Sequence, residues 1–234
     1  MEKQRFIFDL DGTLLTCDYG SCEVEYFNNV FGEEAYELKG GKGYIKNYIL
    51  TGKLIFEGEY SNGEVNGKGK EYYNNGKLEF EGFYLNGEKN GKGKEYSICG
   101  GLEFKGEYLN GKKHGKGKEY YNDGKLRFEG EYLYNYKIKG KYYVNEKLEY
   151  EGEYLYNKKW SGKGYDENGN IIYELIDGNG KVKEYWDNGK LFFEGEYIKG
   201  IINGKVKKYS DDGQLYYEGE YLNGARNGKQ VNNF

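Results

Sequence analysis

Two carboxylates near the start of the chain are the first side chains that could do chemistry. Asp9 and Asp11 follow Arg5-Phe6-Ile7-Phe8, a run that predicts a short buried strand. In proteins, carboxylates act as nucleophiles, as general acids and bases, and as ligands of Mg²⁺. Their spacing at the end of a strand makes Asp9 and Asp11 candidates for such work.

The stretch Asp9-Leu10-Asp11-Gly12-Thr13-Leu14-Leu15 resembles motif I of the haloacid dehalogenase (HAD) superfamily of phosphatases. The resemblance implies that Asp9 is the nucleophile, that Asp11 is the general acid and base, and that both help to hold Mg²⁺. A carboxylate nucleophile needs such a cation to offset repulsion by the phosphate. The other HAD motifs are not found in the sequence. The one acidic pair that could belong to them, Asp211-Asp212, precedes Gly213 and is predicted to lie in a turn.

The other candidate ligands are a single histidine and three cysteines. His114 occupies the position held by Asn66 and Asn90 in neighbouring repeats, so we expect a turn residue there. The cysteines lack the paired spacing of a metal site, which favours reduced thiols in a cytosolic protein. They are Cys17, Cys22 and Cys99. We therefore predict neither a metal site nor a cofactor, with Mg²⁺ expected only for a HAD-like phosphatase.

A helix is predicted after the carboxylates. Ser21 can cap a helix over residues 22–31, with Val24, Phe27 and Phe31 on one face and Gly32 at its end. Residues 1–45 would then form a strand, a loop and a helix. We interpret them as an incomplete HAD-like segment that caps the rest of the chain.

The rest of the chain repeats one phrase. A mid-strand glycine flanked by aromatic residues recurs at spacings of 24, 24, 24, 22, 43 and 24 residues. These glycines are Gly58, Gly82, Gly106, Gly130, Gly152, Gly195 and Gly219. The gap of 43 holds a degenerate copy near 173–177. A fixed period of this length indicates a repeat array.

Each repeat reads as a β-hairpin. In one copy Leu78, Phe80, Gly82 and Tyr84 share a strand face, followed by loops rich in Asn and Gly. Glycine inside a strand costs about 0.5–1 kcal/mol, so its recurrence needs a reason. We expect each glycine to make room for an aromatic ring from the adjacent hairpin.

The recurring Phe/Tyr-x-Gly-x-Tyr followed by Asn-Gly-Lys-Gly resembles the MORN repeat (membrane occupation and recognition nexus). The resemblance implies an all-β fold: an elongated single-layer antiparallel array of about eight hairpins over residues 46–234. It also implies that the array binds other proteins and is not catalytic. Some MORN proteins are linked to membranes, so peripheral binding to anionic phospholipid stays an alternative.

The charge distribution argues against nucleic acid as a partner. The net charge is -4, and residues 37–234 hold 33 basic and 31 acidic side chains. A nucleic-acid binder would show a basic stripe. The Lys-Gly-Lys-Glu runs could form an anionic-lipid strip, but glutamates on the partner strands favour cross-strand pairs.

The sequence therefore predicts a non-enzymatic binding or scaffold module for a protein partner. Exposed tyrosines suit such contacts because they offer a large area at low entropic cost. We expect Tyr73, Tyr121 and Tyr217 to line the binding face. The alternatives are a magnesium-dependent HAD-like phosphatase, or a remnant of one, that uses Asp9 and Asp11, and a peripheral lipid binder. We expect a cytoplasmic location, and a membrane-peripheral location is the alternative.

Overall fold

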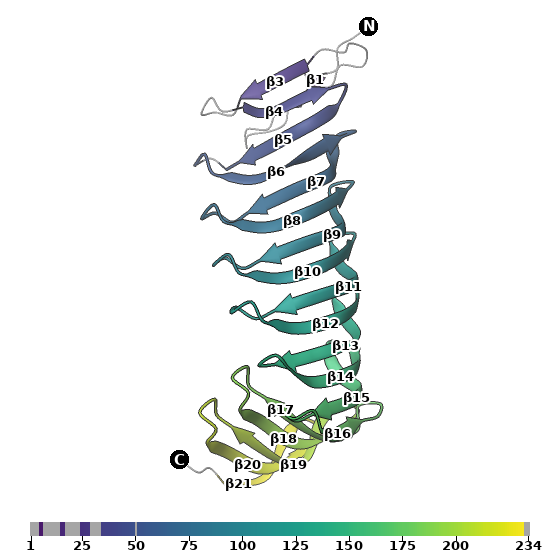
Figure 1. Ribbon diagram of the computed structural model, residues 1–234, viewed down its shortest axis with the longest axis vertical. Helices are drawn as coiled ribbons and strands as arrows, with labels where there is room; N and C mark the ends of the chain where they lie inside the picture. Colours follow the sequence, from purple (N-terminus) through teal and green to yellow (C-terminus); the bar gives the residue numbers. More distant parts are fainter. Residues whose placement is uncertain (1–4, 7–14, 17–23, 29–33, 50, 232–234) are drawn as a thin grey trace. The chain divides into compact units, whose positions relative to one another are not determined.

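The computed structural model describes residues 5–6, 15–16, 24–28, 34–49 and 51–231 (Figure 1). Side chains are described for residues 38–49 and 51–227. Every regular element in these ranges is a β-strand, which confirms the predicted all-β fold. The chain divides into two compact units, Met1–Lys113 and His114–Phe234. The boundary predicted near residue 45 stays a prediction.

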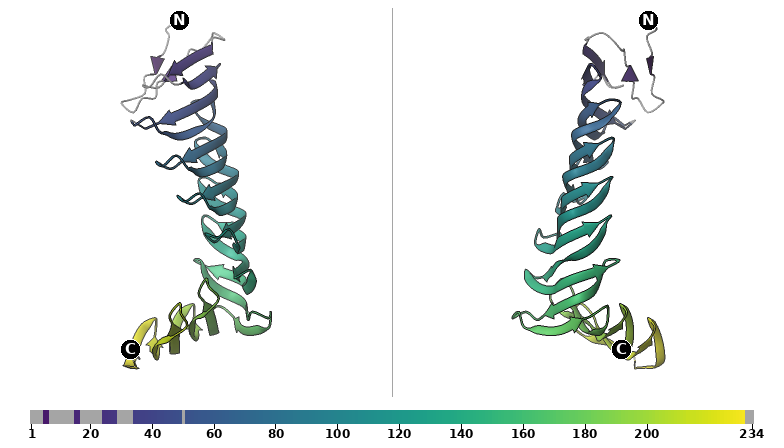
Figure 2. Two further views of the ribbon diagram at one scale, coloured as in Figure 1. Left: turned by 60° about the vertical axis from the view of Figure 1, so that its left-hand side comes forward. Right: turned by 90° about the vertical axis from the view of Figure 1, so that its right-hand side faces the viewer.

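The first unit is a meander in which each strand pairs antiparallel with the next along the chain, from β3 to β10 (Figure 2). The pair β1–β2 stands apart from it. The strands are β1 (Arg5–Phe6), β2 (Leu15–Thr16), β3 (Val24–Asn28), β4 (Glu34–Lys39), β5 (Lys42–Tyr48), β6 (Leu54–Ser61), β7 (Glu64–Tyr72), β8 (Leu78–Leu85), β9 (Glu88–Tyr96) and β10 (Leu102–Leu109). The predicted hairpin array is therefore present.

The second unit contains two antiparallel meanders, β11–β16 and β17–β21. Its strands are β11 (Lys112–Tyr120), which begins at the end of the first unit, β12 (Leu126–Leu133), β13 (Tyr136–Val144), β14 (Lys147–Leu155), β15 (Lys158–Tyr165), β16 (Ile171–Leu175), β17 (Gly180–Tyr185), β18 (Leu191–Ile198), β19 (Ile201–Tyr209), β20 (Leu215–Leu222) and β21 (Ala225–Val231).

The helix predicted over residues 22–31 is wrong at its centre. Val24–Asn28 forms β3 and pairs with β4 in antiparallel register. Val, Tyr and Phe within this run favour a strand, and a neighbouring strand satisfies their backbone groups. The apolar spacing that suggested a helix was outweighed by the available pairing.

Two-residue loops close the hairpins at one edge of each meander. In the β8–β9 loop Asn86 and Gly87 have φ values of 50° and 76°. Two successive positive φ values define the turn that matches the twist of paired strands, and Asn and Gly tolerate them best. The amide of Gly87 also donates to the carbonyl of Val65, which ties this loop to the preceding hairpin.

Longer turns at the opposite edge are tied together by side chains. Three groups of the β7–β8 turn donate to carbonyls of the β9–β10 turn: the Tyr73 hydroxyl to Tyr96, the Asn75 amide to Ile98, and the Lys77 ammonium to Cys99. In the second unit the β17–β18 turn repeats this with Trp186, Asn188 and Lys190. Each turn therefore fixes the position of the next.

The two meanders of the second unit separate between β16 and β17. In other pairs of the second unit glycine faces glycine, as in Gly152↔Gly162, or faces one aliphatic residue, as in Gly162↔Leu175. At the break the corresponding residues are Leu175 and Val182, which are 2% and 1% exposed. Two aliphatic side chains need more room than two glycines, so we attribute the separation to them.

No helix able to span a bilayer occurs among the residues that the structure describes.

Candidate functional site

The face that carries the repeated phenylalanines, hereafter the ring face, is packed by a ladder of aromatic rings. Phe80 meets Tyr84 of its own strand and Tyr108 of the next hairpin, with ring centroids 5.7 and 5.3 Å apart. Both contacts are edge-to-face, the geometry that aromatic pairs prefer. Phe56 and Tyr84 repeat it at 5.6 Å, so Phe56 and Phe80 each link two hairpins.

The glycines do make room for rings, but the expected source of the ring was partly wrong. A Cβ on Gly82 would lie 2.5 Å from the Cζ of Phe80, which belongs to the same strand. A Cβ on Gly93, the partner of Gly82 in β9, would meet Phe80 and, at 3.1 Å, Tyr108 of the next hairpin. Side chains two apart share a strand face, so Phe80 folds down over its own glycine.

Partly buried ion pairs lie beside these rings in a recurring quartet of Glu, Lys, Tyr and Phe. The ammonium of Lys89 lies 2.7 Å from Glu71 and 4.1 Å from the centroid of the Phe80 ring. The hydroxyl of Tyr84 donates to the same glutamate at 2.7 Å. The quartets are Glu71–Lys89–Tyr84–Phe80, Glu95–Lys113–Tyr108–Phe104 and Glu119–Lys137–Tyr132–Phe128. In the second quartet the hydroxyl of Tyr108 is buried but makes no hydrogen bond to Glu95 of normal geometry.

Glu119 is the most enclosed carboxylate of the three quartets, at 8% exposure. It accepts hydrogen bonds from Tyr132 at 2.9 Å and from Arg127 at 3.0 Å, and Lys137 lies 2.8 Å away. Burial opposes its ionisation, but the two cations outweigh burial and lower the pKa of Glu119. This carboxylate is held ionised inside the fold.

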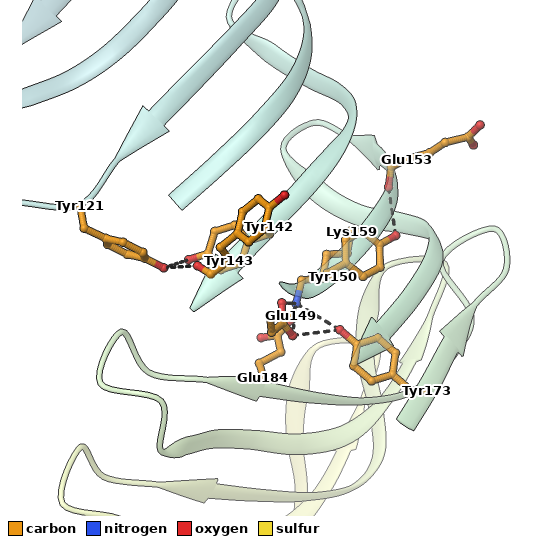
Figure 3. A network of polar contacts seen from close by, with 9 residues as sticks. All are labelled: Tyr121, Tyr142, Tyr143, Glu149, Tyr150, Glu153, Lys159, Tyr173 and Glu184. Carbon is orange, nitrogen blue, oxygen red and sulfur yellow. Dashed lines mark hydrogen bonds and ion pairs between the residues drawn. The ribbon is translucent and has the colours of Figure 1, made fainter. Parts of the chain in front are cut away.

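The fourth quartet is rearranged into the network of Figure 3. Tyr142 stands where the repeat places its glutamate, since Tyr142 pairs with Tyr150 as Glu119 pairs with Phe128. Lys159 turns instead to Glu149, at 2.7 Å, and lies 3.9 Å from Glu184 of β17. The network therefore joins the two meanders of the second unit.

Electrostatics in this network follow from burial. Glu149 is 4% exposed, and burial raises its pKa although Lys159 and Tyr173 stabilise its anion. Burial alone would lower the pKa of Lys159, but Glu149 and Glu184 reverse this and raise it. Two carboxylates share one buried ammonium, an arrangement that holds strands together and offers no open position to a ligand.

The tyrosines predicted to bind a partner make contacts within the chain, and their role in binding stays a prediction. Tyr73 and Tyr121 are half-buried, and their hydroxyls donate to the carbonyls of Tyr96 and Tyr143 at 2.7 Å. The expected exposure of Tyr217 was wrong, because it is 2% exposed within the ring ladder. The period-2 pattern shows which residues share a face of a strand. It does not show which face of a one-layer sheet is buried, so the burial of Tyr217 could not be predicted from it.

Asp9 and Asp11 lie outside the described residues. His114 was expected in a turn but lies in β11, its ring centroid 5.2 Å from that of Tyr134. The equivalent Asn66 also lies in a strand, where its side chain accepts a hydrogen bond from the amide of Asn86. Within the described ranges no three His, Cys, Asp or Glu side chains gather as a metal site would require.

The opposite face of each meander carries lysine and glutamate in register. Lys94 lies 2.6 Å from Glu81, and Lys118 lies 2.9 Å from Glu129. The same pairing recurs at Lys70–Glu57, Lys141–Glu151, Lys163–Glu174, Lys183–Glu194 and Lys207–Glu218. The predicted cross-strand pairs are confirmed.

Exposed apolar side chains gather at two adjacent loops of the second unit. The loop patch consists of Leu133, Tyr134, Tyr136, Leu155 and Tyr156, which are 40–72% exposed. The rings of Tyr136 and Tyr156 meet at 5.8 Å. Sequence reasoning missed this patch, although both loops read Tyr-Asn where most of the others read Asn-Gly.

Backbone conformation sets these loops apart as well. Tyr134 and Tyr156 have φ values of 48° and 50°, the left-handed region that a bulky side chain rarely adopts. Asn86 occupies the same place in the β8–β9 loop with a φ of 50°. Two tyrosines are thus held where asparagine would fit at lower cost, and both stand in solvent.

Two solved structures align with most of this chain. The crystal structure of TcdB2-TccC3-TEV aligns with 88% of this chain and 12% of that chain, at 8% identity and a TM-score of 0.19. The crystal structure of TcdB2-TccC3-Cdc42 aligns with 83% of this chain and 13% of that chain, at 10% identity and a TM-score of 0.17. This chain spans a small part of those chains, and the TM-scores are too low to indicate a shared fold.

Family models give the more informative comparison. A MORN repeat model matches residues 80–98 and 104–125, and a MORN repeat variant matches residues 65–86, 179–199 and 202–223. No curated protein matches the chain. Neither model supports the HAD resemblance of residues 9–15, and no catalytic family is indicated. MORN repeats, which generally serve as binding or scaffold modules, are therefore present in both units of this chain.

Proposed function

We propose that this chain is a non-enzymatic scaffold that holds a protein partner on the loop patch. The observation that carries the proposal is the exposure of five apolar side chains at two neighbouring loops, with Tyr156 at 72%. Contiguous exposed apolar groups mark interaction sites, and tyrosine is enriched in protein interfaces. The left-handed backbone of Tyr134 and Tyr156 supports a functional reading, because local strain tends to be kept where function needs it.

The ring face is a weaker candidate for the partner. Phe80, Phe104, Phe128 and Phe193 are 0–2% exposed, and in the three quartets the glutamates and lysines already satisfy one another. A partner would have to displace those contacts, whereas the loop patch is available without any rearrangement. The three complete quartets of the ring face therefore stabilise the fold, and the loop patch is the better candidate for binding.

Anionic membrane is also less favoured. Lipid headgroups attract clusters of uncompensated lysine and arginine. On the face opposite the ring face, Lys94, Lys118 and Lys141 each lie within 4 Å of a glutamate. The local field of such pairs is close to neutral.

The experiment compares partner recovery by two variants from an extract of the source cells. The double variant Tyr134→Asn/Tyr156→Asn keeps the turn chemistry and removes both exposed rings. Tyr216→Asn removes a tyrosine of similar exposure, 43%, that lies outside the loop patch. We expect the double variant to recover at least about fivefold less partner, a loss of about 1 kcal/mol in binding. Equal recovery by wild type and double variant, with both proteins folded, would refute the proposal.

A further inference from the structure

The last hairpins of the second unit depart from the quartet in one respect. Lys208 pairs with Tyr217 across β19 and β20, the register position that Glu119 and Phe128 occupy across β11 and β12. A cation therefore stands where three quartets place the carboxylate. Arg226 pairs with Tyr221, as Lys137 pairs with Tyr132. The basic position is filled by Arg226, and the acidic position holds a second cation, Lys208.

The donors converge on one hydroxyl group. The ammonium of Lys208 lies 3.1 Å from the hydroxyl oxygen of Tyr221, and the Nε of Arg226 lies 3.4 Å from it. The guanidinium of Arg226 also lies 4.6 Å from the centroid of the Tyr217 ring. In the Glu119 quartet the equivalent cation and hydroxyl both reach the carboxylate. In the last hairpins no carboxylate of the described ranges stands between them, and Lys208 and Arg226 donate to the hydroxyl oxygen of Tyr221 instead.

The described side chains supply no carboxylate partner to these two cations. Among the described residues, no ion pair is formed by Lys208 or Arg226, whereas Lys207 on the opposite face lies 3.8 Å from Glu218. The pKa of Tyr221 is consistent with this: burial would raise it, but Arg226 and Lys208 lower it. Two positive charges beside a hydroxyl donor form the complement of an anion.

Arg226 is exposed and Lys208 is half-buried, so the position can be reached from solvent. Its ring walls, Tyr217 and Tyr221, are 2% and 8% exposed and keep one side of it apolar. A guanidinium supported by a ring offers a planar fork that matches a carboxylate. The geometry is that of the quartet with its acid removed.

We propose that Lys208, Arg226 and Tyr221 bind a carboxylate side chain of an acidic partner segment, which completes the quartet from outside the chain. The inference deepens the proposed binding function and rests on it, because it names the chemistry of a protein partner. The ligand is assigned as a carboxylate because that is the group the other quartets use in this place. The partner supplies the carboxylate that Glu119 supplies within its own quartet.

The test titrates the full chain with a hexaglutamate peptide by calorimetry at about 0.15 M ionic strength. Lys208→Glu places a carboxylate of the chain in the site, and Lys207→Glu makes the same change in net charge on the opposite face. We expect Lys208→Glu and Arg226→Ala to weaken peptide binding at least about tenfold. Lys207→Glu should leave it within about twofold.

Three results would overturn the inference: no binding of hexaglutamate to the wild type, equal losses in Lys208→Glu and Lys207→Glu, or site-dependent binding of inorganic phosphate or anionic vesicles without binding of the peptide. Circular dichroism of each variant shows that the fold is intact. The proposed scaffold function is scored separately by Tyr134→Asn/Tyr156→Asn, since that variant leaves Lys208 and Arg226 in place. A negative result at the carboxylate site would therefore not contradict the proposal that the loop patch binds a protein partner.

Discussion

The ring of Phe80 lies over the backbone of Gly82, two residues along the same strand, so that a Cβ on Gly82 would come within 2.5 Å of the ring. Gly93, opposite Gly82 in β9, lies under the same ring. One phenylalanine thus covers a pair of facing glycines. The packing unit of the array is a ring over two strands, which explains why the glycines recur in register.

Gly82→Ala should destabilise the chain by about 2–3 kcal/mol, because the ring of a buried phenylalanine would be forced out of place. Gly76→Ala is the matched control. Gly76 has nothing within 4 Å of its added Cβ, and its φ of 81° makes backbone strain the only cost, about 1 kcal/mol. Urea unfolding curves of the two variants give the comparison. Equal losses would show that the ring of Phe80 and the facing strand accommodate a Cβ at position 82 without further cost.

The sequence was sufficient to predict the hairpins, their register and their loops. Asn86-Gly87 requires a tight turn, and alternation places Phe80, Gly82 and Tyr84 on one face whatever the packing. The quartets were not predictable in this way. Glu71 and Lys89 are 18 residues apart, and their contact depends on how consecutive hairpins stack. Burial of Tyr217 was missed for the same reason.

Near the start of the chain a short pattern misled the prediction. Val24 and Phe27 fit one face of a helix as well as a strand, and a segment this short carries too few residues to separate the two periods. Pairing with β4 decides the outcome, and pairing is a property of the fold. The HAD-like stretch shows the related limit, since Asp9 and Asp11 have chemical meaning only with partners that the sequence does not place beside them.

Replacing Tyr156 by asparagine should stabilise the second unit by about 0.5–1.5 kcal/mol. Relief of the left-handed conformation is worth about 1–2 kcal/mol. The exposed ring contact with Tyr136 that is lost contributes about 0.5 kcal/mol. The reverse change, Asn86→Tyr, should cost about 1 kcal/mol at a φ of 50° in the first unit. Thermal unfolding of both variants tests the pair, and a destabilised Tyr156→Asn would show that its ring is needed for the fold.

Lys159→Met should destabilise the chain by about 3 kcal/mol near neutral pH, because Glu149 and Glu184 lose the cation that they share. The pKa of Glu149, already raised by burial, should rise further. A raised carboxyl pKa gives stability that is present below the unfolded value and is lost as pH rises through the folded value.

The loss should therefore be smaller at about pH 5 than at about pH 8. Lys163→Met removes the exposed pair with Glu174 and should cost less than about 1 kcal/mol at either pH. Chemical unfolding at the two pH values provides the measurement. A deficit in Lys159→Met that does not change with pH would contradict the shared-cation interpretation.

Glu119→Gln should show the opposite pH dependence. The pKa of Glu119 is lowered in the folded chain, so its ionisation gives stability above the unfolded pKa of about 4.5. The variant should be about 2–3 kcal/mol less stable than the wild type near neutral pH, because Lys137 and Arg127 lose their anion. As pH falls through the folded pKa of Glu119, the two curves should converge. Parallel curves down to about pH 2 would mean that the glutamate contributes only packing.

Lys208→Glu should restore the quartet of the last hairpins and raise the stability of the second unit by about 1 kcal/mol. The new carboxylate would accept from the hydroxyl of Tyr221 and lie beside Arg226, as Glu119 lies beside Tyr132 and Lys137. Lys207→Glu breaks its pair with Glu218 instead and should lower stability by less than about 1 kcal/mol. Opposite signs for two adjacent substitutions of equal charge, measured by urea unfolding, would establish that the acidic position is specific. A loss in both variants would show that position 208 does not accommodate an acid.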